Sequence, residues 1–495
     1  MSTIPFKNVP QNLRVPLFFA EIDNSQANSG QLPQRALLIG QLTAGGTDPP
    51  NSPVISGGVG DARSRYGNSS MLARMVSDYR NADPFGELWC VGLADDPGAT
   101  AAANTVTVGG APTASGTISL YVSGILYSVA VTTSMTSAQI ASAIAAAITA
   151  DPTCPVLATV VGAVVTLTAV NKGLAGNEID VRVNYGGAPA GESLPAGVTV
   201  TIATPQCAGG TVNPQLATAL ANLSNVEFDS IVLPYTDSIS LDALQAFLSD
   251  ATGRWSWSEQ LYGHVFTAYR GTVAACTTFG AARNNQHESV LGFYDSPTPA
   301  WSVAAMLCGS VIGSLRNDPG QPVQTLPISG MLAPPVPSQF IMSERNTLLY
   351  DGISTFTVDS SGTCHIENLI TTYQTNALGA PDDSYLEIET MFTLVYILQT
   401  LASVVNTKFA RVKLAADGTR FSAGAPIVTP STIKAEIIAQ YQNMETDGYT
   451  QGSAVFAQNL IVQQNATNPN RIDVLFPATL INQLRQFALL AQFRL

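Results

Sequence analysis

The side chains able to act as acid–base catalysts are few, because His264, His287 and His365 are the only histidines of the chain. His287 and the glutamate after it begin like the H-E-x-x-H zinc motif, but the second histidine position holds Leu291. His365 lies two residues from Glu367 on a strand-like run, which favours a paired surface histidine, and His264 is expected to be a half-buried sheet residue. No G-x-S-x-G nucleophile motif lies at a strand-to-helix turn of the sequence. These patterns predict no catalytic residue and no metal site.

A glycine-rich loop at residues 57–60 raises the question of a phosphate-binding site. A P-loop needs a lysine after its last glycine, whereas no lysine lies between Lys7 and Lys172. A dinucleotide fingerprint in this loop would place Arg63 where close packing of helix on strand requires glycine. We therefore predict a plain turn without a cofactor, followed by a helix over 71–79. The candidate N-caps of that helix are Asn68, Ser69 and Ser70.

The charge content of the chain is low and its balance is acidic. Charged residues make up 12% of the sequence, half the usual share of about 25%, and the formal net charge is −13. A surface with so few charges is expected to be hidden against partners, which suits a subunit of a large assembly. The negative charge argues against general nucleic-acid binding and against contact with anionic membranes.

Other signals concern the cellular compartment and the membrane. The six cysteines are scattered singly, which predicts reduced, mostly buried thiols made in a cytosol. The N-terminal sequence has no apolar stretch of signal-peptide length, so we expect the protein to stay in the cell that makes it. The longest apolar run, residues 391–405, is shorter than the roughly 20 residues of a membrane span. It predicts a buried helix and no membrane insertion.

Strand-like and helix-like segments alternate over residues 35–93 and again after residue 206, which indicates an α/β core with a largely parallel sheet. Between them the sequence is rich in Ala, Thr, Val and Gly, with a hairpin pattern over 116–131 and an Ala-rich helix over 137–149. Insertion of such a unit into a surface loop is thermodynamically tolerable. We predict an N-terminal arm (1–34), an α/β core domain (35–96 plus 206–383), an inserted β-rich outer domain (97–205), an α+β C-terminal domain (384–482) and a C-terminal arm (483–495).

The periodicity also predicts individual elements of the two larger domains. The core helices are expected over 213–224, 238–251, 271–282 and 299–315. The core strands after the insert are expected over 228–235, 261–269 and 289–294. The C-terminal domain is expected to hold helices over 384–409 and 431–445, followed by strand-like runs.

One local cluster of cations stands against the acidic background. Lys408, Arg411, Lys413 and Arg420 accompany a single acid, Asp417. Cations at a helix C-terminus complement the helix dipole, which explains the cluster without a partner. The second interpretation is a docking patch for an acidic partner.

Several long motifs, in one order along the whole chain, carry a resemblance to a known family. They are RVPLFFAEIDNSQA and YGNSSMLARMVSDYRNADPFGELW near the N-terminus, and NDPGQPVQTLPISGMLAPP, SERNTLLYDGISTFTVD, ITTYQTNALGAPDDSYLEIETM and RIDVLFPATLINQLRQFALLAQFRL in the C-terminal half. With these motifs the sequence closely resembles the contractile tail sheath proteins of Mu-like bacteriophages.

The resemblance implies a core of subtilisin-like topology without catalysis, an outward-facing insert and a C-terminal domain near the tail tube. It implies stacked hexameric rings that contract around the tube and drive it through the host envelope, with the energy stored in a metastable extended state. The implied partners are further copies of the chain, the tail tube protein, the baseplate and the tail terminator. The implied location is the virion tail, assembled in the host bacterial cytoplasm. The candidate tube-docking residues are Lys408, Arg411, Lys413 and Arg420.

Apolar segments at both chain ends are predicted to exchange strands between subunits. Terminal arms interlace neighbouring subunits in the sheaths that this sequence resembles, and an apolar end strand leaves its backbone unpaired unless another chain completes the sheet. We assign residues 15–22 and 483–495 as these arms, and the run RIDVLF, with its alternating apolar residues, as a further candidate. The predicted interface residues are Val15, Phe18, Phe19, Ile22, Phe487, Leu490, Phe493 and Leu495.

Two other function classes stay open at this point. A surface carbohydrate-binding structural protein would explain the polar, β-rich insert and the low charge. A serine hydrolase built on the α/β core would need a convergent Ser, His and acid, which the sequence does not present.

Overall fold

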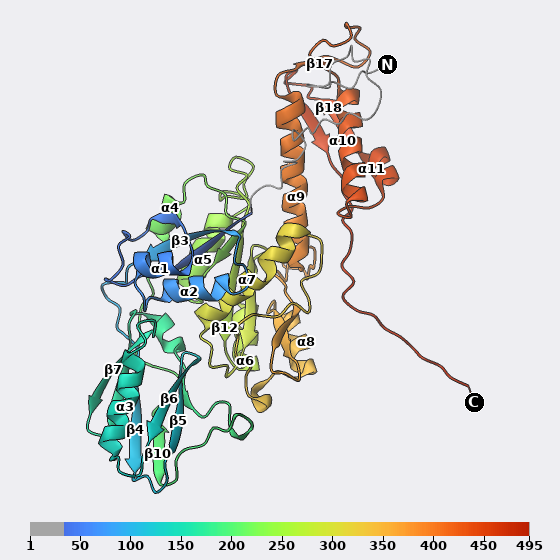
Figure 1. The fold of residues 1–495 in the computed structure, drawn as a ribbon. Helices are drawn as coiled ribbons and strands as arrows, with labels where there is room; N and C mark the ends of the chain where they lie inside the picture. Colours follow the sequence, from blue (N-terminus) through green and yellow to red (C-terminus); the bar gives the residue numbers. More distant parts are fainter. Residues whose placement is uncertain (1–33, 495) are drawn as a thin grey trace, which may run out of the picture.

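The computed structural model describes residues 34–494 of the chain. Figure 1 shows an elongated molecule with an α/β core domain in the middle, the β-rich insert at one end and a mainly helical C-terminal domain at the other. The helix α9 joins the core to the C-terminal domain, and the last residues of the chain run back from that domain past the core.

The core domain is built on a six-stranded sheet in the order β13-β12-β11-β1-β3-β2. All neighbouring strands pair in parallel except β2, which is antiparallel to β3. The central strands β1, β11 and β12 are buried on both faces along most of their length, as expected for the apolar runs of a parallel sheet. The bounds are β1 Arg35–Gln41, β2 Pro53–Ile55, β3 Glu87–Leu93, β11 Ser230–Val232, β12 His264–Arg270 and β13 Glu288–Phe293.

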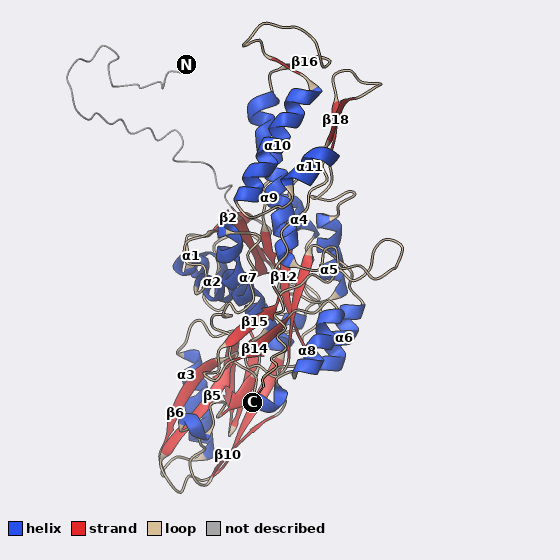
Figure 2. Cartoon of the chain, turned by 90° about the vertical axis from the view of Figure 1, so that its right-hand side faces the viewer, coloured by secondary structure: helices blue, strands red, loops and turns tan. Residues whose placement is uncertain are grey.

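Helices cover both faces of this sheet, with α1, α2 and α7 on one side and α5 and α6 on the other (Figure 2). Of the three N-caps that the sequence allowed for α2, Ser70 is the one used, and its hydroxyl accepts a hydrogen bond from the amide of Ala73 at 3.1 Å. The helix α7 is buried along most of its length and packs on α2. The bounds are α1 Val59–Tyr66, α2 Met71–Arg80, α4 Ala217–Asn222, α5 Ser238–Leu248, α6 Val273–Ala281 and α7 Ala300–Asn317.

The β13 edge of the core sheet is covered by the chain that follows α7. The amide of Ser354 donates to the carbonyl of Val290 at 2.9 Å, and the carbonyl of Ser354 accepts from the amide of Gly292 at 3.1 Å. These bonds satisfy backbone groups that an open edge would expose. The covering elements are α8 Met342–Tyr350 and an antiparallel hairpin of β14 Thr355–Val358 and β15 Cys364–Asn368.

The insert forms two sheets of its own around one helix. The sheets have the orders β10-β4-β8-β7 and β6-β5-β9, and their buried residues form a core separate from that of the α/β domain. The hairpin predicted over 116–131 and the helix predicted over 137–149 are both confirmed. The bounds are β4 Ala103–Gly110, β5 Gly116–Val122, β6 Ile125–Val131, α3 Ser137–Thr149, β7 Val156–Val161, β8 Val164–Ala169, β9 Val181–Val183 and β10 Val198–Ile202.

The C-terminal domain packs helices against a small sheet. Its hydrophobic cluster includes Ile397 of α9, Ile437 and Tyr441 of α10, and Phe456 of α11. Two strands near the end of the domain, β18 and β19, form an antiparallel pair. The bounds are α9 Ile388–Val404, β16 Lys413–Leu414, β17 Ile427–Val428, α10 Pro430–Thr446, α11 Ser453–Asn459, β18 Ile461–Gln464 and β19 Ile472–Leu475.

The helix α9 continues through one π-helical turn to Phe409. Within residues 34–494, Ile388–Phe409 is the single helix whose length and mean hydropathy of 1.6 would suffice to cross a membrane. Its first half is buried against the core, as Met391 and Phe392 show, whereas Val405 is 54% exposed. The prediction of a buried helix is therefore correct for the first half of α9 and wrong for the second.

Candidate assembly surfaces

The insert occupies the edge of the core sheet where α/β proteins usually bind ligands. Such sites lie at the carboxyl ends of the strands, where the strand order reverses, which in this sheet is between β1 and β11. There the side-chain amide of Gln41 donates to Asp95 at 2.7 Å and to the carbonyl of Lys172, a residue of the insert, at 2.5 Å. Asn171 of the insert donates to the carbonyl of Leu42 at 2.8 Å. The usual ligand crevice is thus filled by the protein's own chain.

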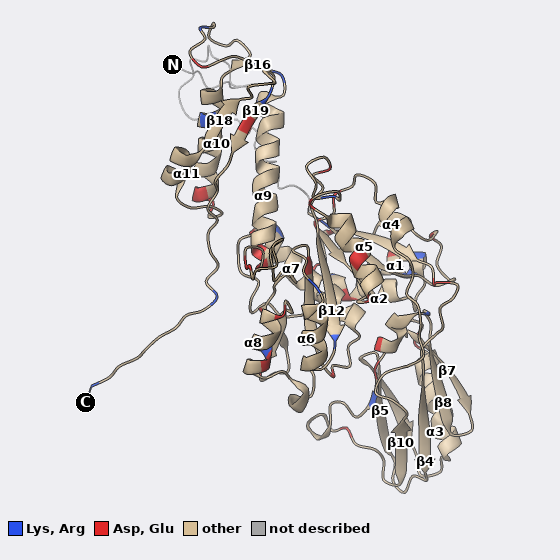
Figure 3. Ribbon diagram, turned by 180° about the vertical axis from the view of Figure 1, so that it is seen from behind, with Lys and Arg blue, Asp and Glu red and all other residues tan. Residues whose placement is uncertain are grey.

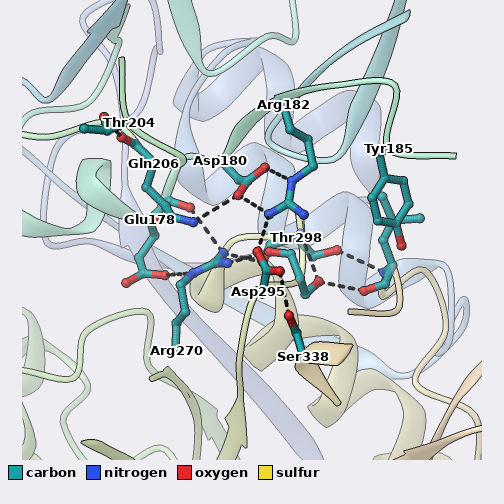
Figure 4. Close-up of polar contacts among 12 residues, drawn as sticks. Glu178, Asp180, Arg182, Tyr185, Thr204, Gln206, Arg270, Asp295, Thr298 and Ser338 are labelled. Atoms are coloured by element: carbon teal, nitrogen blue, oxygen red, sulfur yellow. Dashed lines mark hydrogen bonds and ion pairs between the residues drawn. The ribbon is translucent and has the colours of Figure 1, made fainter. Parts of the chain in front are cut away.

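Ion pairs fasten the insert to the core beside this edge (Figure 4). The guanidinium of Arg182 donates to the buried carboxylate of Asp180 at 2.6 and 2.5 Å, and to Asp295 of the core at 3.1 Å. From the core side, Arg270 donates to Glu178 of the insert at 2.8 Å. We call these five residues the insert joint. Tyr185, Gln206, Thr298 and Ser338 add further hydrogen bonds around it.

The insert joint was not expected from the sequence, although one signal for it exists. Lys172 and Arg182 are the two cations between residues 97 and 205. Both lie where the insert meets the core. A β-rich unit that is otherwise poor in cations therefore concentrates them at its attachment.

His264 and Ser289 form the contact that most resembles a hydrolase dyad. The ring nitrogen Nε2 of His264 lies 2.8 Å from Oγ of Ser289. His264 is 2% exposed and Ser289 is 0% exposed, so the expectation of a half-buried His264 is wrong and no substrate can reach the pair. Burial, followed by the nearby His287, lowers the pKa of His264 to about 3, which makes it a weak base. This dyad offers no site for a hydrolase.

The other two histidines are structural partners of carboxylates. His365 Nε2 lies 3.0 Å from Asp359 Oδ2, so the expected surface pair exists, but with Asp359 in place of Glu367. A backbone carbonyl, together with Asp359, raises the pKa of His365 above its usual value. His287 Nε2 lies 2.8 Å from Asp250 Oδ1.

The glycine-rich loop leads directly into α1, a helix that was not expected from the sequence. The amide of Gly57 donates to the side chain of Asp61 at 2.8 Å. A phosphate at this helix N-terminus would compete with the Asp61 carboxylate, which is itself paired with Arg65 at 2.7 Å. The predicted turn is therefore shorter than expected, since Gly60 already belongs to α1 and the amide of Gly57 is bound by Asp61.

Three of the four predicted docking cations belong to one exposed segment of the chain. Arg411, Lys413 and Arg420 belong to the segment between α9 and β17, and none of them makes an ion pair within the described residues. Figure 3 shows basic segments at this far end of the C-terminal domain, near β16. Among the described residues Asp417 forms no ion pair with them, and its carboxylate accepts a hydrogen bond from the hydroxyl of Ser431 at 2.5 Å. Lys408 differs, since its ammonium lies 2.5 Å from Glu436.

The predicted arm residues fall into two groups. Val15, Phe18, Phe19, Ile22 and Leu495 lie outside the described residues. In the C-terminal arm, Phe487, Leu490 and Phe493 are 83%, 84% and 86% exposed, and Leu489 is 79% exposed. No strand is formed by residues 482–494.

The two-stranded sheet that precedes the C-terminal arm in the sequence is open at both edges among residues 34–494. β18 pairs with β19 from Ile461 opposite Leu475 to Gln464 opposite Ile472, and no third described strand joins them. Ile461, Val474 and Leu475 are 48%, 43% and 59% exposed. RIDVLF, predicted as a strand for exchange, is thus already paired on one side within its own subunit.

Comparison with known proteins gives the chain a family. The model described as phage tail sheath protein central domain matches residues 209–372, and the one described as phage tail sheath C-terminal domain matches residues 380–494. The Mu-like prophage FluMu tail sheath protein of Haemophilus influenzae is 38% identical over 493 residues, which cover 99% of each chain.

Two solved structures are also similar, at low identity. The sheath tail protein of Desulfitobacterium hafniense is 15% identical with a TM-score of 0.49, covering 95% of this chain and 97% of that one. The contracted helical sheath of the anti-feeding prophage is 11% identical with a TM-score of 0.49, covering 97% and 99%. We base the assignment on the sequence matches: this chain belongs to the phage tail sheath proteins, the structural proteins of contractile phage tails.

Proposed function

We propose that copies of this chain assemble into a sheath by strand addition, with the free C-terminal arm of one copy completing the β18–β19 sheet of another. One observation carries the proposal: an apolar end segment without a partner accompanies a two-stranded sheet with two open edges. An isolated two-stranded sheet is marginal in water, so added strands stabilise it. The main-chain bonds give affinity, and the side chains give register.

The arm has the alternation that an added strand requires. In extended chain, Phe487, Leu489 and Phe493 point to one face, because side chains alternate. Burial of each contributes about 1.5–3 kcal/mol. Three such residues in each subunit, repeated along a sheath, supply a large driving force for assembly.

The finer features of the function are part of the same proposal. The copies form stacked hexameric rings around a tail tube, with the baseplate and the tail terminator at the two ends. The extended sheath is metastable, and its contraction drives the tube through the host envelope without a nucleotide. Assembly takes place in the host bacterial cytoplasm, and the chain is not an enzyme. The subtilisin-like topology of the core and its lack of catalysis stay predictions.

The basic loop is proposed to face the tail tube. Arg411, Lys413 and Arg420 are exposed cations without ion-pair partners within the described residues, so an acidic tube surface would attract them. A variant with all three changed to Gln should form sheaths alone but bind the tube more weakly, with a smaller dependence on salt. Lys172→Gln, which removes an exposed cation of the insert, is the control. Unchanged tube binding by the triple variant would contradict this docking surface.

Electron microscopy of purified subunits tests strand addition. The full chain should form hollow striated tubes, and the variant Phe487→Ser, Leu489→Ser, Phe493→Ser should remain as folded small particles. The matched control, Ala488→Ser with Gln492→Ser, changes the opposite face of the same strand and should still form tubes. Tubes from the triple variant would refute the role of the arm.

A further inference from the structure

The C-terminal arm does not leave its own subunit at once. Near its start, the amide of Gln451 donates to the carbonyl of Thr479 at 2.9 Å, and the amide of Ile481 donates to the carbonyl of Tyr449 at 3.2 Å. These bonds tie residues 479–481 to the C-terminal domain. The chain then runs back toward the core, as Figure 1 shows.

At the core, the arm meets the first turn of α9. The side-chain amide of Gln324 donates to the carbonyl of Leu484 at 3.2 Å. The guanidinium of Arg485 donates through Nη2 to Glu389 at 2.5 Å and to Glu387 at 2.7 Å. Only 16% of the Arg485 side chain is exposed, whereas Phe487, two residues later, is 83% exposed.

The carboxylate that receives Arg485 is built into the core. Glu389 is 0% exposed, and its second oxygen accepts a hydrogen bond from the amide of Val323 at 2.8 Å. Burial raises the pKa of Glu389, and Arg485 opposes that rise. A buried carboxylate without a cation is costly, so the core stabilises the position of Arg485 and is stabilised by it.

The arm base is also part of a cavity wall. Arg485 and Gln486 line a cavity of about 630 Å³ together with residues of α8 and of the loop that precedes α9. Asp382 and Asp383 line the same cavity without contacting Arg485. Asp382 and Asp383 are therefore suitable control positions for changes at Glu387 and Glu389.

We propose that Arg485 is the positioning residue of the C-terminal arm. Its ion pairs with Glu387 and Glu389 divide the arm into a stem, residues 481–486, fixed to its own subunit, and a free segment, residues 487–494, that is offered to a neighbour. The stem spans from the C-terminal domain to the core and so forms a second connection beside α9. The role in assembly rests on the proposed strand addition, whereas the ion pairs belong to the single subunit.

Limited trypsin digestion of the soluble subunit measures the stem directly. Trypsin must take the arginine side chain into its own pocket, so cleavage after Arg485 requires the ion pairs to open. Cleavage after Arg420, on the exposed segment between β16 and β17, is the internal reference. We expect the bond after Arg485 to be cut at least tenfold more slowly than the bond after Arg420, as intact mass reports. Equal rates would overturn the proposal.

Two double variants separate the ion pairs from general charge effects. Glu387→Gln with Glu389→Gln should raise the rate of cleavage after Arg485 about tenfold, since proteolysis follows the population of the open form. Asp382→Asn with Asp383→Asn, the matched control from the same cavity, should leave it unchanged. Arg485→Lys, which keeps a cation, should retain part of the protection.

The same variants are then examined for tubes by electron microscopy. The glutamate variant should form about tenfold fewer tubes than the aspartate control, because its free segment is no longer held in place. Normal tubes from a subunit with a released stem would overturn the positioning role. If even the unaltered chain forms no tubes, strand addition fails, while the protection of Arg485 still reports on the ion pairs.

Discussion

Replacing Arg270 with Met tests the joint between the insert and the core. The guanidinium of Arg270 donates to Glu178 of the insert at 2.8 Å, and to the carbonyls of Ser296 and Thr298 at 2.5 and 2.8 Å. Its side chain is 9% exposed. Methionine keeps much of the aliphatic packing and removes the donors, so the change reports on the polar contacts of the joint.

The expected cost follows from burial. Removing one partner of a fully buried ion pair costs about 3–5 kcal/mol, whereas an exposed pair contributes less than about 1 kcal/mol. Glu178 is 29% exposed and recovers part of its hydration when Arg270 is lost. We therefore expect a loss of about 2–3 kcal/mol, of which a double-mutant cycle with Glu178→Gln should assign about 1 kcal/mol to the pair.

Hydrogen exchange read by mass spectrometry resolves where the loss occurs. A loss of 2–3 kcal/mol corresponds to exchange about 30- to 150-fold faster, and we expect it in residues 174–183 and 206–212, which line the joint. Arg471→Met, at a cation whose side chain is 64% exposed, should leave these segments unchanged. Unchanged exchange in Arg270→Met, or a cycle without coupling, would refute the view that this ion pair fastens the insert.

Three further changes test the core and one surface pair. Ser70→Ala removes the N-cap of α2 and should lower the unfolding free energy by about 1 kcal/mol in urea titration, which an unchanged midpoint would contradict. Gly309→Ala would place a Cβ 2.6 Å from the carbonyl oxygen of Tyr79. This clash should cost about 1–3 kcal/mol, which outweighs the gain of up to about 1 kcal/mol in helix propensity. The melting temperature should therefore fall. His365 has its pKa raised by a backbone carbonyl and Asp359, so its stabilising contribution is full below its unfolded pKa of about 6.5 and is lost as pH rises through the folded value. An NMR titration of this ring, assigned with His365→Gln, should give a pKa above that reference, and a lower one would refute the pairing.

Local patterns predicted the elements whose formation is local. The helix over 137–149 has its own capping box and an apolar stripe, and it forms with those bounds. The hairpin over 116–131 turns at Ser123 and Gly124, both of which adopt positive φ. Ser70 was one of three candidate N-caps of α2, and the local sequence alone did not distinguish it from Asn68 and Ser69.

Contacts between distant segments left no such pattern. The short helices α1, α8 and α11 depend on the surface they cover. β4 differs, because Val106 and Val108 are buried at alternate positions and form a local strand pattern that was not recognised in the sequence. Asp359 and Glu367 are both near His365 in sequence, and the geometry of the hairpin decides which one pairs. Arg485 stands alone in an apolar stretch, which signals a partner but does not identify Glu389 as that partner.

The insert joint and the stem stabilise the single subunit, whereas other parts of the chain are proposed to assemble it with its neighbours. The insert joint fixes the insert to the core at the edge where a ligand would otherwise bind, and α9 with the stem connects the core to the C-terminal domain at two places. Within the described residues, the open edges of β18–β19 and the segment 487–494 then stand out as parts without partners of their own. Changes in the insert joint should therefore lower the stability of the subunit, while the molecules that stay folded still form tubes. Changes in the free segment should abolish tube formation without altering the stability of the subunit. A variant that broke this separation, such as Arg270→Met subunits that fold but never form tubes, would mean that the insert itself takes part in the contacts between subunits.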